Sequence, residues 1–248
     1  MLNWFKRRHR SNATLALCPG HGGMGLAAVS RDANQQPVLE WADFIDGADS
    51  RSRGTTLSAT LREHDFEDHH ATSLLPLGEY NLLLVEAPDV PKDELRAAVR
   101  WRVKDLIDFD IDDAVIDIVE VPPLKGGRDN MLYAVVARRA GVRALIDEIE
   151  AADVALDVVD IPEFSLRNLA GLVDEDGGGL AFIYLDDDTG MITITRQNSL
   201  YLSRRFDGGR KRLLASGATS VSVDLEGLLD GIVIEVQRSL DYYESQFA

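Results

Sequence analysis

The sequence predicts an α/β protein in which one architecture occurs twice. Hairpins of apolar strands lead into helices before residue 174, and the same order returns after residue 179. Residues 174–179 (DEDGGG) have the acidic and glycine-rich composition of a linker. No exact internal repeat or low-complexity tract accompanies this pattern in the sequence. We therefore expect two related lobes joined at this linker.

The first half begins with an expected hairpin, residues 13–18 and 26–31 around the glycine-rich tip GHGGMG (20–25). Further strands are expected at 38–44, 71–77, 81–86, 114–121, 131–137 and 154–161. Helices are expected at 91–107, 139–152 and 163–172, and residues 50–64 show helical spacing through Leu57 and Leu61.

The helix at 91–107 is the clearest of the first half. Pro91 suits the first helical position, where its missing N–H costs nothing. Its apolar face is expected to contain Leu95, Ala98, Val99, Leu106 and Ile107.

The second half is expected to be a meander followed by one long helix. The strands are placed at 180–185, 190–196 and 200–205, and the helix at 222–247. Apolar residues recur in this helix at intervals of three and four, which indicates an inward face formed by Leu225, Leu228, Leu229, Ile232, Val233, Val236, Leu240 and Tyr243.

Composition excludes several classes of protein. The chain has 248 residues, with 42 acidic and 26 basic side chains, and its net charge of −16 argues against binding to nucleic-acid phosphates. The single cysteine, Cys18, permits no intrachain disulfide and is expected in the core. No apolar run is long enough to span a bilayer, and the N-terminus does not read as a signal peptide. We expect a cytoplasmic protein.

The first ten residues (MLNWFKRRHR) contain basic side chains and no acid. Trp4 and Phe5 stand beside Lys6, Arg7 and Arg8, a combination suited to the headgroup region of an anionic membrane. Contact with lipid or with an acidic partner is one interpretation of this tip, and a frayed basic start is the other.

The GHGGMG tip could bring backbone N–H groups close to a phosphate. A P-loop or dinucleotide fold would require a helix directly after it, and here a strand follows. A plain hairpin turn is therefore favoured. The histidines 64, 69 and 70 lie among acids, but their polar surroundings favour a solvated loop over a metal site.

Two polar segments of the second half leave alternatives open. Asp186, Asp187, Asp188 and Thr189 could hold Mg²⁺ or form an ordinary turn. Residues 203–212 end with Gly208, Gly209 and three basic side chains, which could bind an anion or form a solvated turn. We expect no metal site, and no catalytic triad is evident.

Residues 90–109 (VPKDELRAAVRWRVKDLIDF) resemble the pattern V-P-x-x-E-L-x-x-A-V-R-W of PilM-type type IV pilus assembly proteins. Residues 192–209 (ITITRQNSLYLSRRFDGG) resemble their strand pair ending in S/T-R-x-x-x-G-G. Residues 234–246 (IEVQRSLDYYESQ) resemble their E-I-x-R-S-L-x-Y-Y-x-S-Q helix. The MshI-type proteins of mannose-sensitive haemagglutinin (MSHA) pilus biogenesis are the most similar members.

The resemblance implies an actin-like (ribonuclease H-like) ATPase fold with an inserted strand-helix-strand-strand module. A first lobe would cover residues 11–173, with the module at about 79–137, and residues 180–248 would begin an incomplete second lobe. It further implies a scaffold on the cytoplasmic face of the bacterial inner membrane. The partners would be the cytoplasmic tail of a PilN-like bitopic protein and other proteins of the pilus platform.

Members of the family bind ATP, but both phosphate loops depart from the family pattern here. The first lacks the aspartate and lysine of D-I-G-x-x-x-x-K, and Tyr184 stands where the second loop has an aspartate. We therefore expect no enzyme and weak or absent binding of Mg-ATP. If a nucleotide does bind, the resemblance and the suitability of glycine backbones and aspartates for holding phosphate and Mg²⁺ indicate the binding residues. These are Gly20, Gly22, Gly23, Asp186, Asp188, Thr189, Gly208 and Gly209.

The resemblance places the partner tail beside the inserted module. There the helix at 91–107 presents Arg96, Arg100, Arg102 and Lys104 in a strongly acidic chain, and such a stripe could steer an acidic tail. The alternative is that these side chains pair with Asp93, Asp105 and Asp108 as a solvated helix face.

Overall fold

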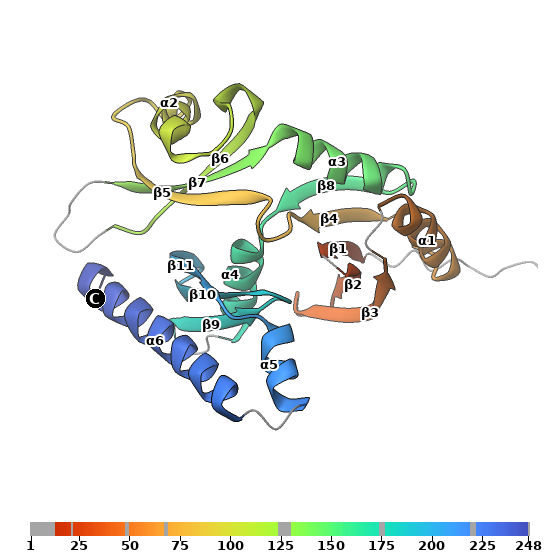
Figure 1. Cartoon of the computed structure of the whole chain (residues 1–248). Helices are drawn as coiled ribbons and strands as arrows, with labels where there is room; N and C mark the ends of the chain where they lie inside the picture. The colour runs from red at the N-terminus through yellow and green to blue at the C-terminus, as the bar shows by residue number, and fades with distance from the viewer. Residues whose placement is uncertain are drawn as a thin grey trace, which may run out of the picture. The chain divides into compact units, whose positions relative to one another are not determined.

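The computed structural model describes residues 13–20, 22–47, 50–66, 69–123, 130–173, 177–218 and 222–247. The expected basic tip therefore lies outside the described residues. The chain divides into two compact units, Met1–Glu79 with Arg139–Ile161 and Tyr80–Arg138 with Pro162–Ala248 (Figure 1). We describe each unit separately.

The first unit contains a five-stranded sheet of order β3-β2-β1-β4-β8. Its strands are β1 (Thr14–Gly20), β2 (Gly23–Arg31), β3 (Pro37–Asp46), β4 (His70–Leu74) and β8 (Ala155–Asp160). The first three strands form an antiparallel meander, and β4 and β8 add to it in parallel. Helices α1 (Ser50–Glu63) and α3 (Arg139–Glu150) belong to the same unit.

The core of the first unit follows the periodicity of the sequence. Alternate residues of β1, Leu15 and Leu17, are fully buried, as strand geometry requires. Leu57 and Leu61 of α1 lie one turn apart and are also buried, which confirms the helix indicated by their spacing. The prediction that Cys18 lies in the core is wrong, because the alternation that buries its neighbours leaves it exposed.

The second unit contains the expected inserted module. Strand β5 (Tyr80–Glu86), helix α2 (Leu95–Val103), β6 (Ala114–Glu120) and β7 (Met131–Arg138) follow in order. Two single-turn helices, η1 (Lys104–Leu106) and η2 (Ile111–Asp113), join α2 to β6. The sheet is antiparallel with the order β5-β7-β6, and Val99 and Val103 of α2 pack against its buried Val85, Leu132 and Val136.

The rest of the second unit is the expected meander with its helices. Strands β9 (Leu180–Leu185), β10 (Thr189–Arg196) and β11 (Ser199–Asp207) pair antiparallel in the order β11-β10-β9. Helix α4 (Pro162–Val173) precedes them, and α5 (Arg210–Ala218) and α6 (Ser222–Phe247) follow. Both α4 and α6 pack on β10 and β11. Helix α5 was not predicted from the sequence.

Helix α2 is shorter than predicted. Pro91 does not occupy its first position, because residues 91–94 form a turn in which the N–H of Glu94 donates to the Pro91 carbonyl at 3.0 Å. Leu106, expected in the apolar face, is 56% exposed because the α-helix ends at Val103 and a single 3₁₀ turn follows.

Helix α6 has the expected length, but only part of its apolar surface is buried. Leu228 is buried as predicted, whereas Leu229, Val233 and Leu240 are exposed. Leu225 lies outside the described side chains. No helix in the described part of the chain is both long and apolar enough to cross a membrane.

Candidate functional site

The glycine-rich tip is a tight hairpin. Strand β1 extends to Gly20, which pairs with Gly23 of β2, so only two residues remain in the turn instead of the six expected. A Cβ atom on Gly23 would lie 2.1 Å from the carbonyl oxygen of Ile45 in β3. Close packing of strands therefore explains Gly23, whereas the space around Gly22 is open. Phosphate binding at these glycines stays a prediction.

The second loop brings together two segments that lie more than twenty residues apart. The N–H groups of Arg210 and Lys211, at the start of α5, donate to the carbonyls of Asp186 and Asp187 at 2.7 and 3.0 Å. Gly209 permits this approach, because a Cβ atom there would lie 2.3 Å from the Asp187 carbonyl oxygen. The acidic turn and the basic segment after β11 thus form one compact structure.

Two carboxylates of this turn, Asp187 and Asp188, are paired with cations. Asp187 accepts from the guanidinium of Arg210 and lies 3.3 Å from the ammonium of Lys211, which is also 3.2 Å from Asp188. The hydrogen bond from Arg210 holds the pKa of Asp187 below its ordinary value. Any Mg²⁺ ion held by Asp187 or Asp188 would compete with these cations.

Two histidines of the first unit belong to an aromatic cluster with Trp41 and Phe66, and a third forms an ion pair. The ring centroid of His64 lies 4.7 Å from that of Trp41, and the ring centroid of His69 lies 5.1 Å from that of Phe66. The Nδ1 atom of His70 lies 2.9 Å from a carboxylate oxygen of Asp157. Across the described residues, no cluster of three or more histidine, cysteine or acidic side chains could hold a metal ion.

The basic stripe on α2 is paired within the module. Arg96 contacts Asp117 of β6 at 2.7 Å, Arg100 contacts Asp112 at 2.9 Å, and Arg102 contacts Glu86 of β5 at 3.1 Å. These partners come from neighbouring elements and not from Asp93, Asp105 or Asp108, the partners expected from the sequence. Exposed pairs of this kind contribute about 0–1 kcal/mol each and leave little net positive field.

Trp101 is a surface feature that was not predicted from the sequence. It is 71% exposed on α2, and the ammonium of Lys104 lies 5.9 Å from its ring centroid. Leu106 is exposed nearby in the chain, on η1. Exposed tryptophan with neighbouring aliphatic side chains is typical of binding surfaces. The sequence contained a sign of this exposure, because Trp101 stands between Arg100 and Arg102 and does not belong to the predicted apolar face of the helix.

A buried polar cluster ties the module to the rest of the second unit. The hydroxyl of Tyr80 in β5 donates to the fully buried carboxylate of Glu163 in α4. Arg205 of β11 donates to the same carboxylate at 3.3 Å, and its guanidinium stacks 4.4 Å from the Tyr80 ring centroid. Burial raises the pKa of Tyr80 well above its ordinary value, so the phenol stays protonated. This cluster is structural, since its groups satisfy one another.

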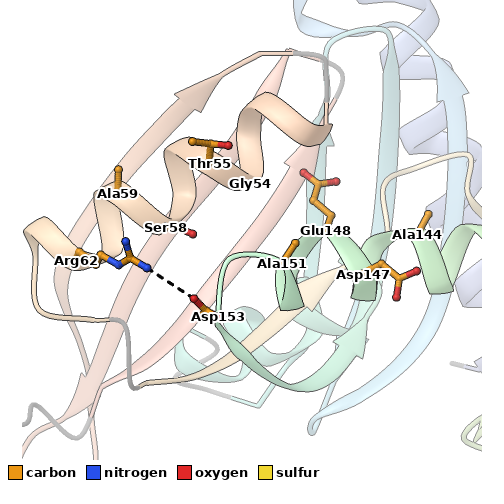
Figure 2. Close-up of a pocket in the computed structure, with 10 residues that line it drawn as sticks. All are labelled: Gly54, Thr55, Ser58, Ala59, Arg62, Ala144, Asp147, Glu148, Ala151 and Asp153. Atoms are coloured by element: carbon orange, nitrogen blue, oxygen red, sulfur yellow. Dashed lines mark ion pairs between the residues drawn. The ribbon is translucent and has the colours of Figure 1, made fainter.

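The first unit has a groove of about 800 Å³ between α1 and α3 (Figure 2). Small side chains line most of it, and an ion pair between Arg62 and Asp153, 3.7 Å long, crosses one end. Glu148 of α3, which lines the groove, pairs with the buried Arg53 of α1 at 2.8 Å. The charged residues of the lining are paired with other protein side chains, so the groove shows no chemistry that identifies a ligand.

Comparison with known proteins identifies the fold. The sequence matches no protein-family model and no curated protein sequence. One matching solved structure is the PilM-PilN type IV pilus biogenesis complex, with 18% identity and a TM-score of 0.75 over 95% of this chain and 78% of the other. The chain has the α/β actin-like ATPase fold.

A second match is the cytoplasmic domain of EpsL, an inner membrane component of the Vibrio cholerae type II secretion system. It shares 16% identity with a TM-score of 0.55 over 84% of this chain and 75% of the other. A Bacteroides thetaiotaomicron protein of actin-like ATPase fold and unknown function has a TM-score of 0.48 and 10% identity. At these identities the likeness concerns the fold.

Proposed function

We propose that the chain is a non-enzymatic adaptor of a type IV pilus assembly platform, of the MshI type found in MSHA pilus biogenesis. It would work in the cytoplasm at the inner face of the bacterial inner membrane. There it would bind the cytoplasmic tail of a PilN-like bitopic protein. The observation that carries this proposal is the match to the PilM-PilN complex over nearly the whole chain, inserted module included. The three PilM-like sequence segments support it independently.

The proposed docking surface is the exposed side of the inserted module around α2. Trp101 and Leu106 would supply apolar anchors, because large exposed side chains lose the most water on binding. Arg96, Arg100 and Lys104 would contact the tail at the rim. Because Arg96 and Arg100 are already ion-paired, they attract an acidic tail less strongly than unpaired cations would.

Binding of the full chain to a synthetic peptide of the tail, followed by fluorescence anisotropy, tests this surface. We expect Trp101→Ala to weaken binding at least tenfold. Leu169→Ala, which removes an apolar helix side chain exposed on α4, should leave it unchanged. Reversing Arg100 and Lys104 to glutamate separates steering from anchoring, since only steering depends strongly on salt. Equal affinity of all the variants would show that α2 is not the docking surface.

The alternative function within the same machine is an ATP-binding switch, which the actin-like ATPase fold itself favours. Against it stand the hairpin tip, which lacks aspartate and lysine, and the pairing of Asp187 and Asp188 with Arg210 and Lys211. Calorimetric titration with Mg-ATP should show weak binding or none. Micromolar affinity would establish the switch, and the peptide titration repeated with Mg-ATP would then measure its coupling to the tail.

A further inference from the structure

Helix α6 carries a row of apolar side chains that its own sheet does not cover. Leu229, Val233, Val236 and Leu240 follow one another at intervals of four, three and four residues. Leu229, Val233 and Leu240 are 46%, 59% and 42% exposed, and Val236 is half-buried. A repeat of this kind is the seam with which one helix packs along another. We name these four residues the α6 seam.

The seam is distinct from the face that holds α6 on the sheet. Leu228 and Ser239 are buried, and Glu235 pairs with Arg204 of β11 at 3.7 Å. At 100° per residue, the centre of the seam lies about 110° around the helix from the direction of these three residues. Beyond it, Tyr243 and Phe247 continue the repeat and pack on Tyr201 of β11. Leu228, Ser239, Tyr243 and Phe247 therefore contact the rest of the unit, whereas three of the four seam residues stay exposed.

The solvent side of the seam carries one sign of charge. Its border consists of Glu226, Asp230, Gln237, Asp241 and Glu244, all of them exposed. The basic residue Arg238 lies on the opposite side of the helix and contacts Glu235 at 2.8 Å. A segment that packs on the seam consequently meets carboxylates along its edge.

We propose that the α6 seam is a docking surface for an amphipathic helix of a partner protein, one with apolar residues at intervals of three and four and lysine or arginine along its flank. The apolar row supplies the contact area, and the acidic border selects the charge of the partner. The surface lies on α6 and is separate from the α2 surface of the proposed function.

A second copy of the chain fits this surface poorly. Two α6 helices packed seam to seam would each bring a border whose charged residues are all acidic, and Arg238, the basic residue among the described α6 side chains, lies on the other side of the helix. Like charges so placed destabilise a helix pair. Charge complementarity thus favours a basic partner over self-association.

The test uses the full chain and two synthetic helical peptides that share leucines at intervals of three and four. One carries lysine and arginine on its flanks, and the other carries glutamate. Fluorescence anisotropy should show at least tenfold tighter binding of the basic peptide. The double variant Asp230→Lys/Glu244→Lys should reverse this preference.

The chain offers a matched control on the same helix. Val233→Glu places a charge in the seam and should reduce affinity for the basic peptide at least tenfold. Ile234→Glu changes a neighbour that is 49% exposed but points away from the seam, and should leave affinity within about twofold. Circular dichroism establishes that both variants fold.

Three results would overturn the proposal. One is equal affinity for the two peptides, and a second is equal loss in the Val233→Glu and Ile234→Glu variants. The third is sedimentation showing a dimer of the parent chain that Val233→Glu converts to a monomer, because the seam would then join two copies.

Discussion

At the scale of single residues, Arg53 and Glu148 form a buried ion pair. The two side chains are 10% and 8% exposed, and Arg53 also donates to the carbonyl of Gly47 at 3.1 Å. A buried charge that loses its partner keeps its desolvation cost, so breaking such a pair is more costly than the pair itself is stabilising.

Glu148→Gln is therefore expected to lower the free energy of unfolding by about 3 kcal/mol. Asp153→Asn, which breaks the exposed pair with Arg62, should cost about 0.5 kcal/mol or less. Urea unfolding followed by circular dichroism measures both. If the two variants lost similar free energies of unfolding, burial would not explain the cost of breaking the Arg53–Glu148 pair.

Asp187 gives a pH-dependent prediction. Its pKa is lower in the folded state, so its stabilising contribution is present above its ordinary value of about 3.9 and is lost as the pH falls through the folded value. Asp187→Asn removes this contribution. The variant should consequently lose less stability than the parent between pH 5 and pH 3, as measured by urea unfolding at each pH.

At the scale of elements, the carboxylate of Glu163 joins β5, α4 and β11. Replacing it with glutamine leaves the guanidinium of Arg205 without its counter-ion and changes the acceptor for Tyr80. We expect Glu163→Gln to destabilise the protein by about 2 kcal/mol in urea unfolding. Glu226→Gln, on the exposed side of α6, serves as control. An unchanged midpoint for Glu163→Gln would show that the three elements hold together by apolar packing alone.

At the scale of the whole molecule, charge is unevenly distributed along the chain. Residues 1–10 contain Lys6, Arg7, Arg8 and Arg10, and without these four side chains 22 basic and 42 acidic residues remain, a net charge of −20. A body of this charge is repelled by anionic lipid, so contact with the membrane would depend on the basic tip, at about 1 kcal/mol for each basic residue near the surface.

Deleting residues 1–10 is accordingly expected to reduce sedimentation of the protein with anionic liposomes at low salt. Neither the parent nor the truncated chain should sediment with neutral liposomes. If the truncated chain and the parent sediment equally with anionic liposomes, then Trp4, Phe5 and the neighbouring basic residues have no role at the membrane.

The sequence by itself determined most of the elements and the fold. Alternation places Leu15 and Leu17 inside a strand, and helical spacing places Leu57 and Leu61 inside a helix, because local backbone geometry decides which residues share a face. Together with the three PilM-like segments, this was sufficient to predict the actin-like fold, and the match to a PilM structure confirms it.

Only the tertiary structure decided which residues meet and which faces are covered. Arg53 and Glu148 lie 95 residues apart, and Asp187 and Arg210 lie 23 apart, so no local pattern links them. The exposure of Trp101 and of the α6 seam has the same origin. Periodicity shows that residues such as Leu229 and Val233 share a face, but what covers that face depends on packing between segments distant in the chain.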